Sequence, residues 1–233
     1  MSKSRVIASF FFIAATLGAL PVSALTLVPQ DQGTIHESHS RSTGRFTHDP
    51  SSTDLLVFRR YTGSAGAASR GYALFSIPSS PLSFGSAVLH LNANVDAPNY
   101  PGTTPLQVWD VTTPPSFFDR AFTSGGSLIN RTWPERAAYL DLGEGVAYAS
   151  ASLDTGASTP SLTLSAGALA ALNAARGGIF AIGLTGPSSF RMTLDGLQLQ
   201  LTPVPEPSSA VLLLAGCAGI VAWRHGSRNG GVA

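Results

Sequence analysis

The chain has 233 residues, of which only 12% are charged, and its formal net charge is +1 at neutral pH. So sparse and balanced a charge excludes strong electrostatic capture of nucleic acid. The single cysteine, Cys217, lies near the C-terminus, so the preceding chain has no thiol for a disulfide, a metal ligand or a nucleophile.

The first 24 residues have the three parts of a secretory signal peptide. Lys3 and Arg5 form a basic start, residues 6–20 are apolar, and Val22-Ser23-Ala24 supplies the small residues that signal peptidase requires. We therefore expect export and cleavage by signal peptidase after Ala24. Fold arguments then apply to residues 25–202, which are enough for one domain with a sizeable core.

The segment 25–52 contains three of the five histidines, His36, His39 and His48. A site built on His36-Glu37-x-His39 would combine imidazole and carboxylate ligands that suit zinc. On a strand, however, His36 and His39 point to opposite faces, and the helical His-Glu-x-x-His spacing is missing. We therefore expect an early strand and a solvated loop, with no metal and no cofactor.

Short strand-like runs separated by Gly and Pro clusters follow from residue 55 onward. They are expected at residues 55–61, 70–77, 86–95 and 105–111. Within the third run, Leu89 and Leu91 alternate with His90 and Asn92, which predicts one buried face and one solvated face that carries His90. Many short alternating runs are typical of an antiparallel β-sandwich.

Two of these runs resemble strands of DNRLRE-type domains, which are secreted bacterial modules related to a carbohydrate-binding family. The matching residues are 70–78, Arg-Gly-Tyr-Ala-Leu-Phe-Ser-Ile-Pro, and 85–91, Gly-Ser-Ala-Val-Leu-His-Leu. The resemblance implies a jelly-roll sandwich. Ser76 stands where such modules often have Asp, so the resemblance implies a fold and no binding site.

Aromatic residues are frequent between residues 109 and 133. Residues 116–136 are expected to form a long loop, and loops of this length often carry function. Because aromatic rings stack on sugar faces, four residues are candidates for carbohydrate contact: Trp109, Phe117, Phe118 and Trp133. Buried aromatic residues more often belong to the core, and this alternative stays open.

The last part of the domain is expected to contain a hairpin, a helix and three strands. The hairpin joins residues 137–142 to residues 145–153. The helix spans residues 166–176, with Ser165 as its N-cap and Gly177 after its end. The strands are expected at residues 179–185, 190–195 and 196–202. The whole domain is thus predicted to be all-β, a jelly-roll-like sandwich with one short helix.

No arrangement of residues points to catalysis. The chain has no Gly-x-Ser-x-Gly elbow, P-loop or dinucleotide fingerprint. Its carboxylates are few and mostly fall in expected turns, where Asp usually binds its own backbone. Asp110 with Asp119 is the pair that would best suit a glycosidase. We therefore expect a protein that is not an enzyme, with a carbohydrate-active enzyme as the alternative.

The tail, residues 203–233, changes character twice along its length. The prolines of Val204-Pro205-Glu206-Pro207 remove two backbone donors and end a preceding strand. Residues 208–223 are then expected to form an apolar helix, which is short for a full membrane span. The basic end, residues 224–233, contains Arg224 and Arg228, which the positive-inside rule places on the cytoplasmic side.

This order is similar to the PEP-CTERM sorting signal of Gram-negative bacteria that make exopolysaccharide. The resemblance implies that the tail holds an intermediate in the inner membrane and that an exosortase, a membrane-embedded cysteine peptidase, processes it. It also implies transfer to the cell surface or extracellular matrix and association with exopolysaccharide. The alternatives are an ordinary C-terminal anchor helix for the tail, and a structural matrix protein without a specific ligand for the domain.

Overall fold

The computed structural model describes residues 23–40, 43–50, 55–62, 65–80, 82–97, 102–127, 133–187 and 190–204. These residues form thirteen strands, two α-helices and one 3-10 helix, so the domain is predominantly β, as expected. All the strand pairs are antiparallel.

The elements, in chain order, are β1 (Leu25–Leu27), β2 (Asp31–His39), β3 (Thr43–Asp49), β4 (Leu55–Thr62), β5 (Ala65–Ser76), β6 (Phe84–Asp96), β7 (Thr104–Asp110), η1 (Pro115–Phe117), β8 (Phe122–Ser127), α1 (Pro134–Asp141), β9 (Ala147–Leu153), β10 (Gly156–Ser158), β11 (Ser161–Thr163), α2 (Ala166–Ala174), β12 (Ile179–Thr185) and β13 (Arg191–Pro203).

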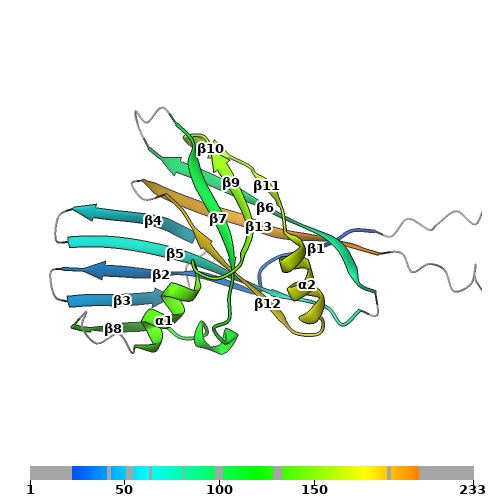
Figure 1. Cartoon of the computed structure of the whole chain (residues 1–233), viewed down its shortest axis with the longest axis horizontal. Helices are drawn as coiled ribbons and strands as arrows, with labels where there is room; N and C mark the ends of the chain where they lie inside the picture. Colours follow the sequence, from blue (N-terminus) through cyan, green and yellow to red (C-terminus); the bar gives the residue numbers. More distant parts are fainter. Residues whose placement is uncertain are drawn as a thin grey trace, which may run out of the picture.

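The sheet divides into two arms at β5. On one edge of β5, residues 65–69 pair with β4, whereas residues 71–76 pair with β12. β4 leads on to β13 and β6, and β12 leads on to β7 and β9. The other edge of β5 pairs with β2, which is followed by β3 and β8. Figure 1 shows β7 and β9 crossing over β6 and β13.

The larger core lies between the two arms. Leu89 and Leu199 reach it from β6 and β13, and Phe75 and Ile182 reach it from β5 and β12. Helix α2 adds Leu172 to the same core. Full burial of a side chain of this size contributes roughly 1.5–3 kcal/mol, so this core holds the arms together. The arrangement is sandwich-like, with apolar side chains of two sheet portions facing each other.

A second core covers the outer face of β2, β3 and β5. Ile35, Phe46 and Tyr72 project from the strands, and they are covered by Phe118 after η1 and by Tyr139 of α1. Figure 1 shows α1 lying across this part of the sheet. The β2–β3–β5 portion is therefore covered on one face by a helix and a loop.

Helix α2 confirms the helix that was expected near residue 166. The hydroxyl of Ser165 accepts a hydrogen bond from the Ala168 amide at 3.3 Å, which makes Ser165 the N-cap. Gly177, with φ at 76°, follows the helix and lets the chain reverse. The helix ends two residues before the expected Arg176, a difference within the usual uncertainty of helix ends.

The expectation of a single helix is wrong, because residues 134–141 form α1 where a hairpin strand was expected. Pro134 occupies the first turn, where its missing N–H costs nothing, and Glu135 favours the positive end of the helix dipole. Ala138 and Tyr139 are buried in the second core. An apolar run this short does not distinguish strand from helix, and packing decided it. Residues 116–136 likewise include the end of η1, the whole of β8 and the start of α1, so the expectation of one long loop is wrong.

The first and last strands of the domain are neighbours. Leu25 pairs with Leu201 and Leu27 pairs with Leu199. The amide of Val204 donates to the Ser83 carbonyl at 2.7 Å, so the chain is held up to that residue. Both ends of the described domain therefore lie at the same end of the molecule, as Figure 1 shows.

Candidate functional site

The residues expected to form the sorting and cleavage signals lie at or beyond the ends of the described domain. Ala24 is exposed and directly precedes β1. Val204 is 44% exposed and directly follows β13. The rest of the motif and the basic end lie outside the described residues: Pro205, Glu206, Pro207, Arg224 and Arg228. None of the described helices is long and apolar enough to cross a membrane, and the expected apolar helix falls outside them.

The four aromatic candidates for carbohydrate contact lie in two different places. Trp109 is half-buried on β7, and its indole N–H donates to the Thr185 hydroxyl at 2.8 Å. Phe118 belongs to the second core, and Phe117 and Trp133 are partly buried against it. Phe118 is 0% exposed and is stacked on Tyr72 with ring centroids 4.3 Å apart, so it offers no surface to a ligand. Contact of the other three with carbohydrate stays a prediction.

The two carboxylates suggested as a glycosidase pair have separate neighbours. One Asp110 oxygen accepts from the Val146 amide at 2.7 Å, which ties this carboxylate to the turn before β9. Asp119 lies just after η1 and is exposed, and its negative charge contributes to the raised pKa of Asp31. The carboxyl group of Asp110 thus has a structural hydrogen bond.

A buried polar cluster in the second core was missed by sequence reasoning. His48 is 3% exposed; one ring nitrogen lies 2.8 Å from the Arg120 carbonyl and the other lies 2.8 Å from the Tyr72 hydroxyl. The Tyr72 hydroxyl is 3.5 Å from Asp31, and burial raises the pKa of that carboxyl. Since both nitrogens of His48 have partners, this ring fastens the η1 segment onto the sheet. Phe46 and His48 alternate on β3 and therefore point to the same face, and this spacing is the signal that could have predicted a buried His48.

His36 lies on the opposite face of β2 from Glu37 and His39, as expected for a strand. Its Nδ1 forms a hydrogen bond with the Ser69 hydroxyl. Burial lowers the pKa of His36, and the nearby charge of Arg191 lowers it further. Within the described ranges, no group of three or more His, Cys, Asp or Glu side chains is placed to hold a metal ion.

A hollow of about 460 Å³ lies where the two arms diverge, beside the end of α1. Arg70 donates from one nitrogen to the carbonyls of Tyr139 and Leu140, at 3.0 and 2.7 Å. Its guanidinium also lies 4.5 Å from the centre of the Tyr139 ring. A cation that binds the last carbonyls of a helix stabilises the helix end, so the role of Arg70 here is structural.

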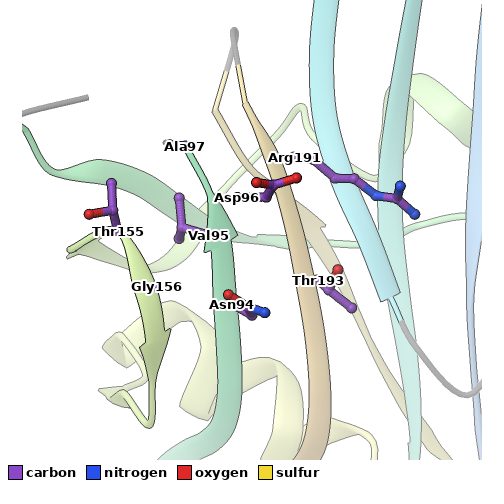
Figure 2. Close-up of a pocket in the computed structure, with 8 residues that line it drawn as sticks. All are labelled: Asn94, Val95, Asp96, Ala97, Thr155, Gly156, Arg191 and Thr193. Atoms are coloured by element: carbon purple, nitrogen blue, oxygen red, sulfur yellow. The ribbon is translucent and has the colours of Figure 1, made fainter. Parts of the chain in front are cut away.

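Two larger hollows adjoin each other on the outer face of β6 and β13. They have volumes of about 570 and 540 Å³ and share Asn94 and Thr193. Figure 2 shows the first, with Asp96 and Arg191 on neighbouring strands and Thr155 beside β10 at its rim. Sites for small molecules have volumes of roughly 300–1,000 Å³, so both hollows are large enough for a ligand.

The side chains around these hollows are paired across the two strands. Asn92 is opposite Asp195, Asn94 is opposite Thr193, and Asp96 is opposite Arg191. The alternate residues of β6 and β13 are buried in the larger core. Because opposed residues of an antiparallel pair point to the same face, these six side chains form a polar ladder on the solvated side. We call this set the β6–β13 polar face.

The polar groups of β6 and β13 differ in whether they already have partners. Toward the chain ends, His90 is hydrogen-bonded to Ser161 at 2.7 Å and to Gln200 at 3.1 Å. The Asn92 amide donates to Asp195 at 2.6 Å. At the far end, four side chains form no hydrogen bond or ion pair within the described part of the chain: Asn94, Asp96, Arg191 and Thr193. Figure 2 shows the Arg191 guanidinium reaching away from the Asp96 carboxylate.

No protein-family model matches this chain, and no curated protein sequence is significantly similar to it. The sequence signals at the two ends and the geometry of the domain between them are thus the basis for a functional proposal.

Proposed function

We propose that the protein is a secreted, non-catalytic component of the cell envelope or extracellular matrix that is sorted through a PEP-CTERM tail and associates with exopolysaccharide. Signal peptidase cleaves after Ala24, and residues 25–202 fold as a jelly-roll-like β-sandwich. The apolar helix, residues 208–223, holds an intermediate in the inner membrane. An exosortase then processes the motif at Val204–Pro207, and the protein passes to the cell surface or matrix.

The observation that supports this proposal is the position of the two ends of the domain. β1 pairs with β13, so the exposed residues Ala24 and Val204 lie at one end of the molecule. Both proposed cleavage points can therefore be reached by membrane-bound peptidases without unfolding of the sheet. A tail held in the membrane would bring only this end close to the bilayer.

The sorting step is tested by replacing Val204–Pro207 with four alanines. Export through the N-terminal signal should continue, but the protein should accumulate as a full-length inner-membrane species, because the apolar helix and basic end are retained. Fractionation of the native host and the mass of the product measure the result. Deletion of residues 208–233 is the control, and it should release a soluble periplasmic domain. An alanine variant that matures to the wild-type mass at the surface would contradict the sorting role.

The association with exopolysaccharide is tested with polymer purified from the native host. The full-length protein, kept soluble in mild detergent, should be retarded by this polymer in affinity gel electrophoresis and should release no reducing sugar from it. Release of reducing sugar would favour the carbohydrate-active enzyme. Neither retardation nor release would favour a structural matrix protein without a specific ligand.

A further inference from the structure

The β6–β13 polar face has the properties of a binding surface at the end of the sheet farthest from the chain ends. From the strand pairing, its hollows, its unpartnered side chains and its charge, we infer that it binds an extended, uncharged polysaccharide chain through Asn94, Asp96, Arg191 and Thr193. This inference rests on the proposed association with exopolysaccharide and assigns that association to a place on the molecule.

The backbone beneath this face is rigid. β6 and β13 are paired through eleven residue pairs. Their inward side chains belong to the larger core, and Met192 and Leu194 are fully buried directly beneath the face. Side chains held on such a frame lose less conformational freedom on binding than side chains on a loop, so more of their interaction energy contributes to affinity.

The unpartnered groups match the hydrogen-bonding capacity of sugar hydroxyls. A hydroxyl donates one hydrogen bond and accepts others. Asn94 and Thr193 offer both donors and acceptors, Asp96 offers acceptors and Arg191 offers donors. Because these groups have no partner among the described residues, a ligand would replace only water and would break no internal hydrogen bond.

The charge of the face favours an uncharged ligand over an acidic one. The carboxylates of Asp96 and Asp195 outnumber the guanidinium of Arg191 among the residues that line the two hollows. An acidic chain, such as a polymer of uronic acids, would place its carboxylates near this excess of negative charge and would be repelled. The hydrogen-bonding groups remain suitable for neutral hexose units.

The face extends along the strands and onto β4, which favours a chain over a single sugar. The two hollows follow β6 from Asn92 to Asp96, roughly 13 Å at about 3.3 Å per residue. Arg191 is opposite Phe58 on β4, and with Asp96 this makes a row on three neighbouring strands, roughly 10 Å long at about 4.8 Å between strands. The half-buried ring of Phe58 lies at the end of the row and can cover the apolar face of a sugar unit.

The face lies clear of the membrane end. The stretch of β13 from Arg191 to Thr202 is roughly 35 Å long at about 3.3 Å per residue. Leu25, at the start of the domain, pairs with Leu201 near its end, so both termini leave the domain at this point. A tail in the inner membrane therefore leaves the hollows open to solvent. The same face would be available before and after removal of the tail.

The test is the double substitution Asn94→Ala with Thr193→Ala. The matched control is Ser86→Ala with Thr202→Ala, an exposed pair that is opposite on the same strands and the same face but near the chain ends. The probe is exopolysaccharide of the native host, separated by anion exchange into neutral and acidic fractions. Full-length proteins in mild detergent are compared by affinity gel electrophoresis, and their thermal unfolding is recorded to confirm equal folding.

The wild type and the control should bind the neutral fraction equally well. The double variant should bind it at least about tenfold more weakly, since two side chains lose their hydrogen bonds to the chain. A complete acid hydrolysate of the same fraction should compete poorly, because single sugars contact only part of the row. Equal binding by the double variant, strong competition by the hydrolysate, or binding of the acidic fraction alone would overturn the inference while the association itself stands. Binding of neither fraction by the wild type would instead contradict the proposed function.

Discussion

At the scale of single residues, His36 gives the fold a defined response to pH. Burial and the charges of Arg191 and His48 lower its pKa from the ordinary value of 6.5, so the folded state favours the neutral ring. Between the lowered pKa and 6.5 the unfolded chain binds more protons than the folded one. Stability from this residue is therefore fully present above pH 6.5 and is lost as the pH falls through that window.

Substitution of His36 by Gln should reduce this acid sensitivity. The urea midpoint of the wild type should fall between pH 8 and pH 5, and that of the variant should fall less over the same interval. The pH 8 values provide the control, because they report the cost of the substitution itself, including the lost hydrogen bond to Ser69. An identical fall in both proteins would show that His36 is not a source of the pH response.

At the scale of elements, the contact between β12 and the end of α1 requires that Gly183 has no side chain. A Cβ on Gly183 would lie 2.4 Å from the Leu142 carbonyl oxygen and 2.7 Å from the Leu142 Cα, both backbone atoms just after α1. Neither atom can move unless the helix moves. Close approach of backbone is one of the reasons why a strand contains glycine.

Gly183→Ala should therefore destabilise the domain by about 1–3 kcal/mol through overpacking. Equilibrium unfolding in urea measures the loss. Gly156→Ala is a useful comparison, because φ at Gly156 is 92° and a Cβ there would meet nothing within 4 Å. Its cost should be backbone strain alone, about 1–2 kcal/mol. If Gly183→Ala proved neutral, α1 would not be pressed against β12 as described.

At the scale of the whole molecule, the two cores share strands and are expected to unfold together. Phe75 of β5 is in the larger core, while Tyr72 and Leu74 of the same strand are in the second core. Loss of packing on one face of β5 therefore removes support from the other face. The domain is expected to unfold in a single cooperative transition.

Phe118→Ala provides the test, because Phe118 is fully buried in the second core only. We expect a loss of about 3–5 kcal/mol and a shift of the whole transition. Tryptophan fluorescence, to which Trp133 beside the second core and Trp109 on β7 both contribute, and far-ultraviolet circular dichroism should give the same midpoint. Leu194→Ala in the larger core is the counterpart and should also shift both signals together. Two separated transitions in either variant would show that the cores are independent.

Local signals in the sequence were enough for much of the fold. The alternation in residues 86–95 correctly predicted the buried and solvated faces of β6, including the place of His90 on the solvated face. Ser165 and Gly177 correctly marked the ends of α2. These features depend on a residue and its near neighbours in the chain, so composition and spacing determine them. The all-β class followed from the same local patterns.

Only the tertiary structure decided which distant segments meet. The switch of β5 from β4 to β12, the choice of helix for residues 134–141 and the opposition of Asp96 and Arg191 all depend on long-range packing and register. A shift of one residue in register would turn the polar residues of one strand, such as Asn94 on β6, into the core, yet nothing local to either strand specifies their pairing. The sequence by itself determined the polar character of each strand, and it is the source of the export and sorting predictions for the two ends. The polar face exists because burial of the larger core aligned β6 with β13.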